Sequence, residues 1–191
     1  MAFDKVDTLI MVITALERLG IQYLIGGSFA SSFYGYPRTT MDADVLASIK
    51  LDQADALVKE IQSEFYVDAQ AVRRAIQTNT HFNLIHTGSL FKVDVFLAKS
   101  DAFTANQLER RQLHSLRPDQ SAYFATAEDT ILAKLNWYRR GGEISDLQWR
   151  DIIGIINVQG SRLDLGYLRQ WAQQLNVHDL LEEALIEAET K

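Results

Sequence analysis

The sequence predicts an α+β protein, in which a mixed β-sheet with flanking helices is followed by a C-terminal α-helical bundle. Up to about residue 125, segments with apolar residues at helical spacing alternate with short, strand-like apolar runs bounded by glycine and proline. After Phe124 the helical spacing continues alone. We therefore expect an α/β domain over residues 1–125 and a helical domain over residues 126–191 packed against it.

Each element of this prediction is marked by periodicity and by its end signals. In the first domain we expect helices over 5–19, 29–34, 51–64 and 69–77, and strands over 22–25, 41–47, 81–86, 90–97 and within 113–124. The strands 81–86 and 90–97 flank a Thr87-Gly88-Ser89 turn, which predicts an antiparallel hairpin. In the second domain, capping residues predict helices that start near Thr126, Ser145, Asp164 and Asp179.

The composition narrows the class of protein. The chain has 191 residues, of which 47% are apolar and 23% charged, as in ordinary globular domains. It has no cysteine, which excludes disulfides and thiolate metal sites and is compatible with a cytoplasmic location. No apolar run approaches the ~20 residues that span a bilayer, so we expect no membrane partner. The net charge of −6 disfavours broad electrostatic binding of long nucleic acids.

The stretch from Ile25 to Val45 contains the first signs of phosphate and metal chemistry. An apolar run ends in a Gly26-Gly27-Ser28 turn, and Asp42 and Asp44 follow in an alternating segment. Glycines let a phosphate approach the backbone closely, and the next helix would direct its N-terminus at that phosphate. Alternate residues of a strand share a face, so both carboxylates project together, roughly 6–7 Å apart at Cα. Because carboxylates this close resist ionising together without a cation, we expect Mg²⁺ here.

A third carboxylate, Asp94, lies in the strand-like segment FKVDVF. Alternation predicts one face of this strand with Asp94 and an opposite, apolar face with Phe91, Val93, Val95 and Leu97. The same alternation predicts an apolar face on the Asp42 strand, made of Met41, Ala43, Val45 and Ala47. We expect the three carboxylates to converge from adjacent strands.

The Gly-Gly-Ser turn, the Asp-x-Asp pair and the later Asp94 together resemble the nucleotidyltransferase superfamily, which has the DNA-polymerase-β-like fold. This resemblance implies a nucleotidyltransferase-like sheet. It also implies that Asp42, Asp44 and Asp94 bind two Mg²⁺ ions and that Gly26, Gly27 and Ser28 hold the phosphates of a nucleoside triphosphate (NTP).

Further motifs resemble AbiEii-type abortive-infection toxins and related nucleotidyltransferases. They are the Arg38-Thr39 approach to Asp42 and the segment KLNWYRRGGEISDLQWRD, with Lys134 before an Arg150-Asp151 pair. The resemblance implies that Arg38, Lys134 and Arg150 bind the nucleotide and that Asp151 assists the acceptor. The chain departs from the fuller toxin motif at Gly154, where a second aspartate is usual.

The alternative for Lys134 and Arg150 is a solvated helix face or an ion pair with Asp146 or Asp151. If Lys134 meets the triphosphate, its loss should weaken nucleotide binding about ten- to a hundredfold, with little change in melting temperature.

The implied reaction moves a nucleoside monophosphate from an NTP to a hydroxyl or phosphate acceptor, which could be an RNA end, a protein or a small molecule. In one version the chain is the toxin of a toxin-antitoxin pair and has an antitoxin partner. The alternatives are an aminoglycoside-type antibiotic nucleotidyltransferase and a non-catalytic or antitoxin-like module of the same fold that binds a protein.

Overall fold

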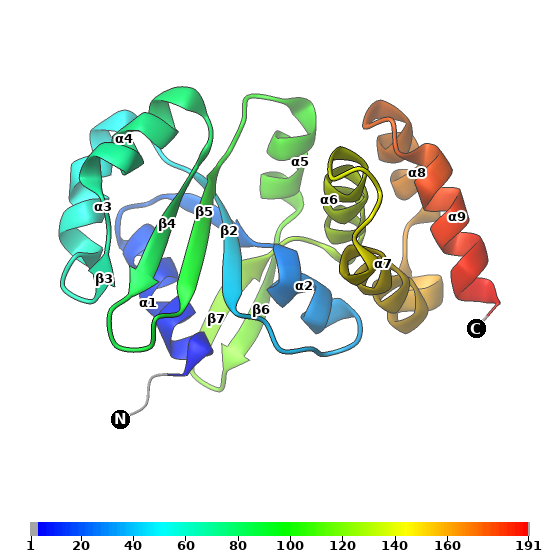
Figure 1. Cartoon of the computed structure of the whole chain (residues 1–191), viewed down its shortest axis with the longest axis horizontal. Coiled ribbons are helices and arrows are strands. Elements are labelled where there is room, and N and C mark those ends of the chain that lie inside the picture. Colours follow the sequence, from blue (N-terminus) through cyan, green and yellow to red (C-terminus); the bar gives the residue numbers. More distant parts are fainter. Residues whose placement is uncertain (1–3, 191) are drawn as a thin grey trace. The chain divides into compact units, whose positions relative to one another are not determined.

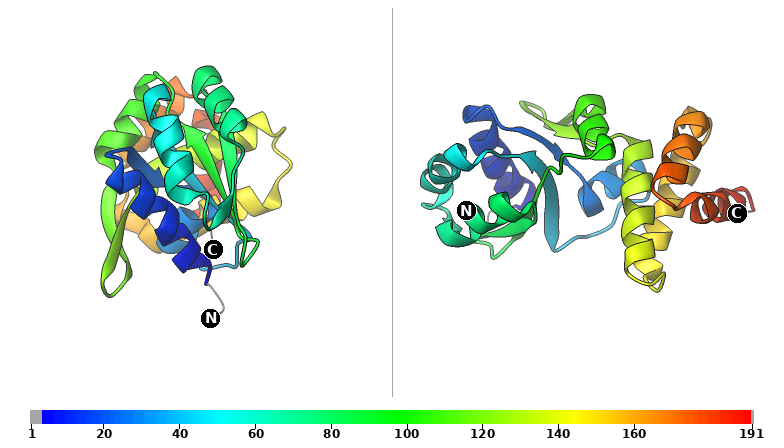
Figure 2. Two further views of the ribbon diagram at one scale, coloured as in Figure 1. Left: turned by 90° about the vertical axis from the view of Figure 1, so that its left-hand side faces the viewer. Right: turned by 90° about the horizontal axis from the view of Figure 1, so that it is seen from above.

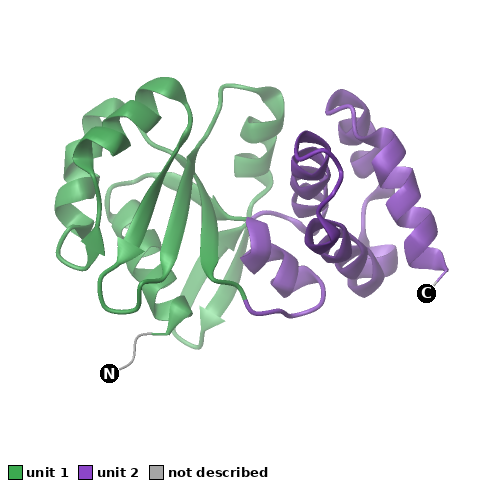
Figure 3. Cartoon of the chain, viewed as in Figure 1, with its two compact units in different colours: residues 1–26, 40–124 green, residues 27–39, 125–191 purple. Residues whose placement is uncertain are grey.

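The computed structural model of the chain describes residues 4–190, so the outermost residues of the two expected domains, 1–3 and 191, lie outside the described residues. The chain forms two compact units, shown in different colours in Figure 3. The sheet unit comprises the residues up to 26 together with 40–124, and the helical unit comprises 27–39 together with the residues from 125 onward. Residues 27–39 thus group with the C-terminal helices, whereas a boundary at 125/126 would leave them with the sheet.

Within residues 4–190, the sheet unit is built on seven strands in the order β3-β4-β5-β2-β1-β7-β6 (Figure 1). β2 pairs with β5 and β1 pairs with β7 in parallel, and the other neighbours are antiparallel. The predicted mixed sheet is therefore confirmed. The strands are β1 (Gln22–Ile25), β2 (Asp42–Ser48), β3 (Phe65–Tyr66), β4 (His81–His86), β5 (Lys92–Leu97), β6 (Gln112–Arg117) and β7 (Gln120–Phe124).

The helices of the sheet unit contact one another and the sheet. α1 contacts α3 and β1, and α4 contacts α3 and β4; Figure 2 shows these three helices grouped together. α5, which contacts β1, follows the last strand of the β4–β5 hairpin. The helices are α1 (Lys5–Arg18), α3 (Ala54–Ile61), α4 (Ala69–Thr78) and α5 (Ala102–Arg110).

Alternation along β2 and β5 separates an apolar face from a polar one. Ala43, Val45, Val93 and Val95 are fully buried. The intervening residues of β2 are half-buried and include the two aspartates. Burying the apolar residues fixes the register of both strands, because a slip of one residue would exchange the two faces. The predicted faces of these strands are confirmed, with the exception of Met41.

Within the described residues the helical unit consists of five α-helices and a 3₁₀ turn, Gly160–Arg162. The α-helices are α2 (Gly27–Tyr34), α6 (Ala127–Arg140), α7 (Asp146–Gln159), α8 (Leu165–Gln174) and α9 (His178–Glu189). α2 contacts both α6 and α7. Three N-terminal caps are as predicted: Thr126, Ser145 and Asp164 accept hydrogen bonds from the backbone N–H groups of Asp129, Gln148 and Tyr167. The fourth is not, because α9 begins at His178 and Asp179 lies within its first turn.

A glycine permits the close approach of α2 to α7. A Cβ atom at Gly35 would lie 2.8 Å from the backbone N of Ile155 and 2.9 Å from the backbone C of Gly154. Both distances are shorter than van der Waals contact, so a larger residue at position 35 would push the two helices apart. A Cβ at Gly154 would in turn lie 3.0 Å from the ring of Tyr36. The position at which the toxin motif usually has an aspartate is thus tightly packed in this chain.

Two local predictions are wrong. Met41 is 76% exposed and precedes β2, so it does not belong to the apolar face. The helix expected over 51–64 begins with a 3₁₀ turn, Leu51–Gln53, and ends at Ile61. This early end leaves room for the two-residue strand β3, which no periodicity could reveal. For residues 102–110 no element was predicted, and they form α5, which the Asp101 side chain caps.

No helix within residues 4–190 is long and apolar enough to cross a membrane.

Candidate active site

The carboxylates of the sheet unit lie side by side on two adjacent parallel strands. In the register of β2 and β5, Asp44 is paired with Asp94, and Asp42 is paired with Lys92. Neighbouring strands lie about 4.8 Å apart, so side chains on the same face of a register pair are direct neighbours. Asn83 on β4 is the register partner of Asp94 on its other side. The sheet thus places Asp42, Asp44 and Asp94 together, as predicted.

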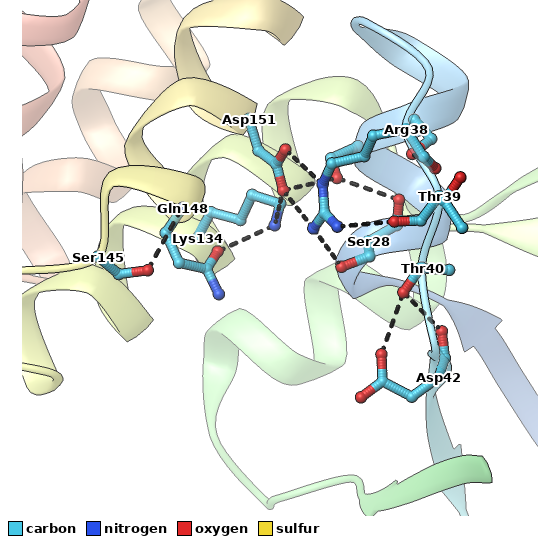
Figure 4. Close-up of polar contacts among 11 residues, drawn as sticks. Ser28, Arg38, Thr39, Thr40, Asp42, Lys134, Ser145, Gln148 and Asp151 are labelled. Carbon is cyan, nitrogen blue, oxygen red and sulfur yellow. Dashed lines mark hydrogen bonds and ion pairs between the residues drawn. The ribbon is translucent and has the colours of Figure 1, made fainter.

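Four hydrogen bonds fix the approach to Asp42 and Asp44. The Thr40 hydroxyl donates to the backbone carbonyl of Asp42 at 3.0 Å and to its Oδ1 at 3.1 Å (Figure 4). The ammonium of Lys5 donates to the backbone carbonyl of Thr40. The backbone N–H of Gly26 donates to the carbonyl of Asp44 at 2.9 Å, which ties the first residue of the Gly-Gly-Ser turn to β2.

Lys92 carries the positive charge on the carboxylate face. Its Nζ lies 2.7 Å from Asp94 Oδ2 and 3.7 Å from Asp42 Oδ2. The hydrogen bond to Asp94 is the largest cause of a raised pKa of Lys92, partly offset by burial, with further contributions from the charges of Asp94, Asp42 and Asp44. The ammonium therefore stays charged. Three carboxylates and one ammonium leave an excess of two negative charges on this face.

The expected convergence of the three carboxylates into one ligand set is not seen. Among residues 4–190, no three His, Cys, Asp or Glu side chains are arranged to hold a metal ion. The physical reason is that three carboxylates repel one another, and the ammonium of Lys92 attracts two of them to itself. The donors nevertheless fit a divalent cation. All are hard oxygen ligands. Asp94 Oδ1 is buried and has no hydrogen-bond partner among the described residues, an arrangement that costs free energy unless a cation or a donor arrives.

The turn after β1 has the backbone conformation that its glycines predict. Gly27 has φ of 53°, a left-handed conformation that favours glycine, and it opens α2. The side chain of Ser28 in the first turn of α2 accepts a hydrogen bond from Arg38 Nη2 at 2.6 Å. Whether Gly26, Gly27 and Ser28 bind phosphate stays a prediction.

The helical unit has its own charged cluster, centred on the buried Asp151 of α7 (Figure 4). Arg38 donates two parallel hydrogen bonds to the carboxylate, from Nε to Oδ1 and from Nη2 to Oδ2, both 2.9 Å long. Lys134 of α6 donates to Oδ2 at 2.9 Å, and Ser31 donates to the same oxygen at 3.2 Å. Lys134 also donates to Gln148 Oε1 at 2.9 Å. We call these residues, with Ser28, the Asp151 network.

The Asp151 network holds its carboxylate in the charged state. Burial raises the pKa of Asp151, but the hydrogen bond from Arg38 and the charge and hydrogen bond of Lys134 outweigh this effect and hold the pKa below its usual range. Both oxygens of Asp151 are occupied by donors. The residue therefore anchors Arg38 and Lys134, and its predicted part in assisting the acceptor stays a prediction.

The structure decides between the alternatives for Lys134. Its side chain is 5% exposed and forms an ion pair with Asp151, so the solvated-face interpretation is wrong and the ion-pair interpretation is correct. The expectation that Lys134 can be removed with little change in melting temperature needs correction for the same reason. Removing one partner of a buried ion pair leaves the other charge poorly compensated. Arg150 is exposed, and the network forms without it.

Three residues of these clusters carry contacts that the sequence motifs did not single out: Lys92, Ser31 and Gln148. Lys92 precedes Asp94 by two residues in a strand, so the sequence already indicated that the two side chains share a face. Gln148 precedes Asp151 by three residues and therefore shares its helix face. For Ser31 no pattern in the sequence gave a signal.

Comparison with known proteins identifies the fold. No family model and no curated protein matches the sequence. Among solved structures, an antigenic nucleotidyltransferase-like protein from Paracoccidioides brasiliensis matches 97% of this chain and 94% of its own, with a TM-score of 0.57 and 19% identity. The chain has a nucleotidyltransferase-like fold.

The antibiotic-resistance factor ANT(2'')-Ia shares this fold. Its crystal structure in complex with adenylyl-2''-tobramycin matches 88% of this chain and 97% of its own, with a TM-score of 0.57 and 11% identity. Its solution structure matches 100% and 97%, with a TM-score of 0.52 and 10% identity. At these identities the likeness concerns the fold, which confirms the predicted α+β architecture and its nucleotidyltransferase-like sheet.

Proposed function

We propose that this protein is a Mg²⁺-dependent nucleotidyltransferase, which moves a nucleoside monophosphate from an NTP to a hydroxyl or phosphate acceptor. One observation carries the proposal: Asp44 and Asp94 are register partners on adjacent parallel strands, and Asp42 shares their face. A structural role does not require three carboxylates on one face of a sheet, because their repulsion opposes folding. A role in binding cations accounts for them.

The reaction is a substitution at the α-phosphorus. An acceptor oxygen forms a new bond to this phosphorus, the bond to the bridging oxygen breaks, and pyrophosphate leaves; the proton of a hydroxyl acceptor passes to water. Mg²⁺ bound by Asp42, Asp44 and Asp94 would neutralise negative charge on the attacking and leaving oxygens. The buried, unpaired Oδ1 of Asp94 is an oxygen that could accept the hydrogen bond of an acceptor hydroxyl and orient it.

The phosphates of the NTP would meet backbone N–H groups and positive charge. Gly27 and Ser28 open α2, whose first N–H groups have no partner within the helix. The Asp151 network has two cations, Arg38 and Lys134, against one carboxylate. Its single surplus positive charge suits an anion. The exposed Arg150 would add a second contact with phosphate or acceptor.

The acceptor could be an RNA end, a protein or a small molecule. The proposed Mg²⁺ ions would themselves balance the excess negative charge of the carboxylate face, so this charge does not select between a polyanion and a cationic small molecule, such as an aminoglycoside. ANT(2'')-Ia, whose complex contains adenylylated tobramycin, is a structural precedent for such an acceptor. A toxin role with an antitoxin partner rests on the sequence motifs alone, as does a non-catalytic role in binding a protein.

The proposal is tested by nucleotidyl transfer itself. Purified protein is incubated with Mg²⁺ and each of the four NTPs, labelled at the α-phosphate, together with an aminoglycoside panel, total RNA or cell lysate protein. We expect the label in one acceptor class and the release of pyrophosphate in equal amount. The matched control is Asp44→Asn, which removes one cation ligand without changing the size of the side chain. Equal labelling by wild type and Asp44→Asn would contradict the proposal.

A further inference from the structure

Lys92 occupies an unusual position among the carboxylates. It lies on β5 two residues before Asp94, so both side chains share a face. The β2–β5 register brings it opposite Asp42. Its Nζ therefore lies between two of the three carboxylates that the proposed function assigns to a divalent cation, 2.7 Å from Asp94 Oδ2 and 3.7 Å from Asp42 Oδ2.

Lys92 is more exposed to solvent than Asp94, and this difference bears on its role. The Asp94 side chain is 12% exposed, whereas the Lys92 side chain is 38% exposed. Asp94 is held in place by its burial, but the long and flexible lysine side chain can turn toward water at little cost. One oxygen of Asp94 is occupied by Lys92, while the other is buried and has no partner within residues 4–190. Lys92 alone therefore leaves the carboxylate incompletely satisfied.

We propose that Lys92 competes with the divalent cation for the carboxylates of Asp42 and Asp94. Its ammonium stabilises the carboxylate face in the metal-free protein, and it has to leave Asp94 when the cation binds. This inference rests on the proposed function in one respect, namely that the three carboxylates bind a divalent cation. It explains why no three-ligand set is already formed among the described residues. It makes Lys92 a positioning residue for Asp42 and Asp94.

Two opposite effects of removing Lys92 follow from this role. Without the ammonium, the metal-free face carries three carboxylates and no cation, so their repulsion should destabilise the fold. A divalent cation, in contrast, no longer has to break an ion pair, and it meets one more negative charge. An ordinary surface ion pair would give neither a gain in cation affinity nor a cation-dependent recovery of stability.

The test measures cation binding without nucleotide and independently of activity. Mn²⁺, which can be followed by its electron paramagnetic resonance, is titrated into the wild type and Lys92→Met at neutral pH and constant ionic strength. We expect Lys92→Met to bind Mn²⁺ about tenfold more tightly, because the lost contact is a charge-assisted hydrogen bond with a partly exposed partner. The metal-free variant should melt about 2–4 °C lower, and Mn²⁺ should restore the wild-type value.

Two further variants serve as controls. Lys92→Arg retains the positive charge and should behave like the wild type in both measurements. Lys59→Met removes one exposed lysine of α3, so it reports the effect of net charge alone and should leave the Mn²⁺ affinity unchanged. Should Lys92→Met fail to fold, Lys92→Gln, which keeps a polar side chain, provides the same comparison.

An unchanged or weaker Mn²⁺ affinity of the Lys92 variants would overturn the inference. If the wild type still transfers nucleotide in that case, the proposed function stands and only the role of Lys92 is wrong. If neither the wild type nor any Lys92 variant binds Mn²⁺ and no transfer is detected, both fail together.

Discussion

The two charged clusters of this protein use the same types of residue in opposite proportions. The carboxylate face of the sheet unit has three aspartates and one lysine, while the Asp151 network has one aspartate with an arginine and a lysine. On the sheet, one carboxylate oxygen is buried and has no hydrogen-bond partner in the part of the chain that the structure describes. In the network, both oxygens of Asp151 accept hydrogen bonds from cations. The first cluster keeps an excess of negative charge that a divalent cation would balance, whereas the second contains more positive than negative charge.

This difference indicates which cluster needs a ligand and which stabilises the fold. Removing one partner of a fully paired, buried carboxylate strongly lowers the stability of the folded protein. Neutralising one member of a set of like charges costs the folded protein little stability and can even stabilise it, because the charges repel one another. Substitutions of similar size should therefore affect stability in one cluster and function in the other.

The largest effect on stability is expected at Asp151. Asp151→Ala leaves Arg38 and Lys134 without their carboxylate inside the helical unit, which should lower the free energy of unfolding by about 3–5 kcal/mol. Urea unfolding followed by circular dichroism measures this loss. Asp146→Ala, at an exposed position of the same helix, should cost at most about 0.5 kcal/mol. Similar losses for both variants would remove the distinction between the two clusters.

Asp44→Asn should show the opposite behaviour. Neutralising one of three mutually repelling carboxylates should leave the metal-free protein as stable as the wild type or slightly more stable. Nucleotidyl transfer should fall by about a hundredfold or more, which corresponds to about 2.7 kcal/mol in the activation free energy. Thermal melts and initial rates on the same preparations measure both properties. A clear loss of stability without a loss of transfer would assign Asp44 a structural role.

Lys134→Met tests whether the network has a second task. Arg38 still pairs with Asp151 in this variant, so the loss of stability should be smaller than in Asp151→Ala, about 1–3 kcal/mol. If the surplus positive charge of the network meets the triphosphate, nucleotide affinity should also fall about tenfold. Calorimetric titration of a non-hydrolysable NTP measures the affinity. Unchanged affinity together with reduced stability would restrict Lys134 to a structural role.

The smallest of these effects concerns acid stability. The pKa of Asp151 is held below its usual range in the folded protein. Its contribution to stability is therefore complete above the unfolded-state pKa of about 3.9 and is lost as the pH falls through the lower, folded-state pKa. The free energy of unfolding of the wild type, measured from about pH 5 downward, should fall more than that of Asp151→Asn. Parallel curves for the two proteins would contradict the lowered pKa.

Much of the fold and part of the candidate site could be predicted from the sequence. The alternation around Asp42, Asp44 and Asp94 was sufficient, because a strand with one buried face has a single register. Gly26 and Gly27 likewise predicted the turn that follows β1. In contrast, β3 has only two residues, which is too short for any period, and α5 has a weak apolar pattern and depends on its Asp101 cap.

Long-range pairing was the part that local patterns could not provide. Arg38 and Asp151 are separated by 113 residues in the sequence, yet they form the double hydrogen bond at the centre of the network. The motif pointed to both residues but not to their contact. The same holds for Lys134, whose burial depends on how α6 packs against α7 and could not be seen in the composition of its own helix.

The central claim, that the carboxylate face binds a divalent cation together with a nucleotide, is tested most directly by binding. Mn²⁺ is titrated into the wild type and Asp94→Asn in the presence of a saturating, non-hydrolysable NTP, and the bound ion is followed by electron paramagnetic resonance. We predict that the wild type binds Mn²⁺ at least tenfold more tightly than Asp94→Asn, in which one charged ligand is lost. Equal Mn²⁺ binding by the two proteins would show that the cation does not use this face and would contradict the account.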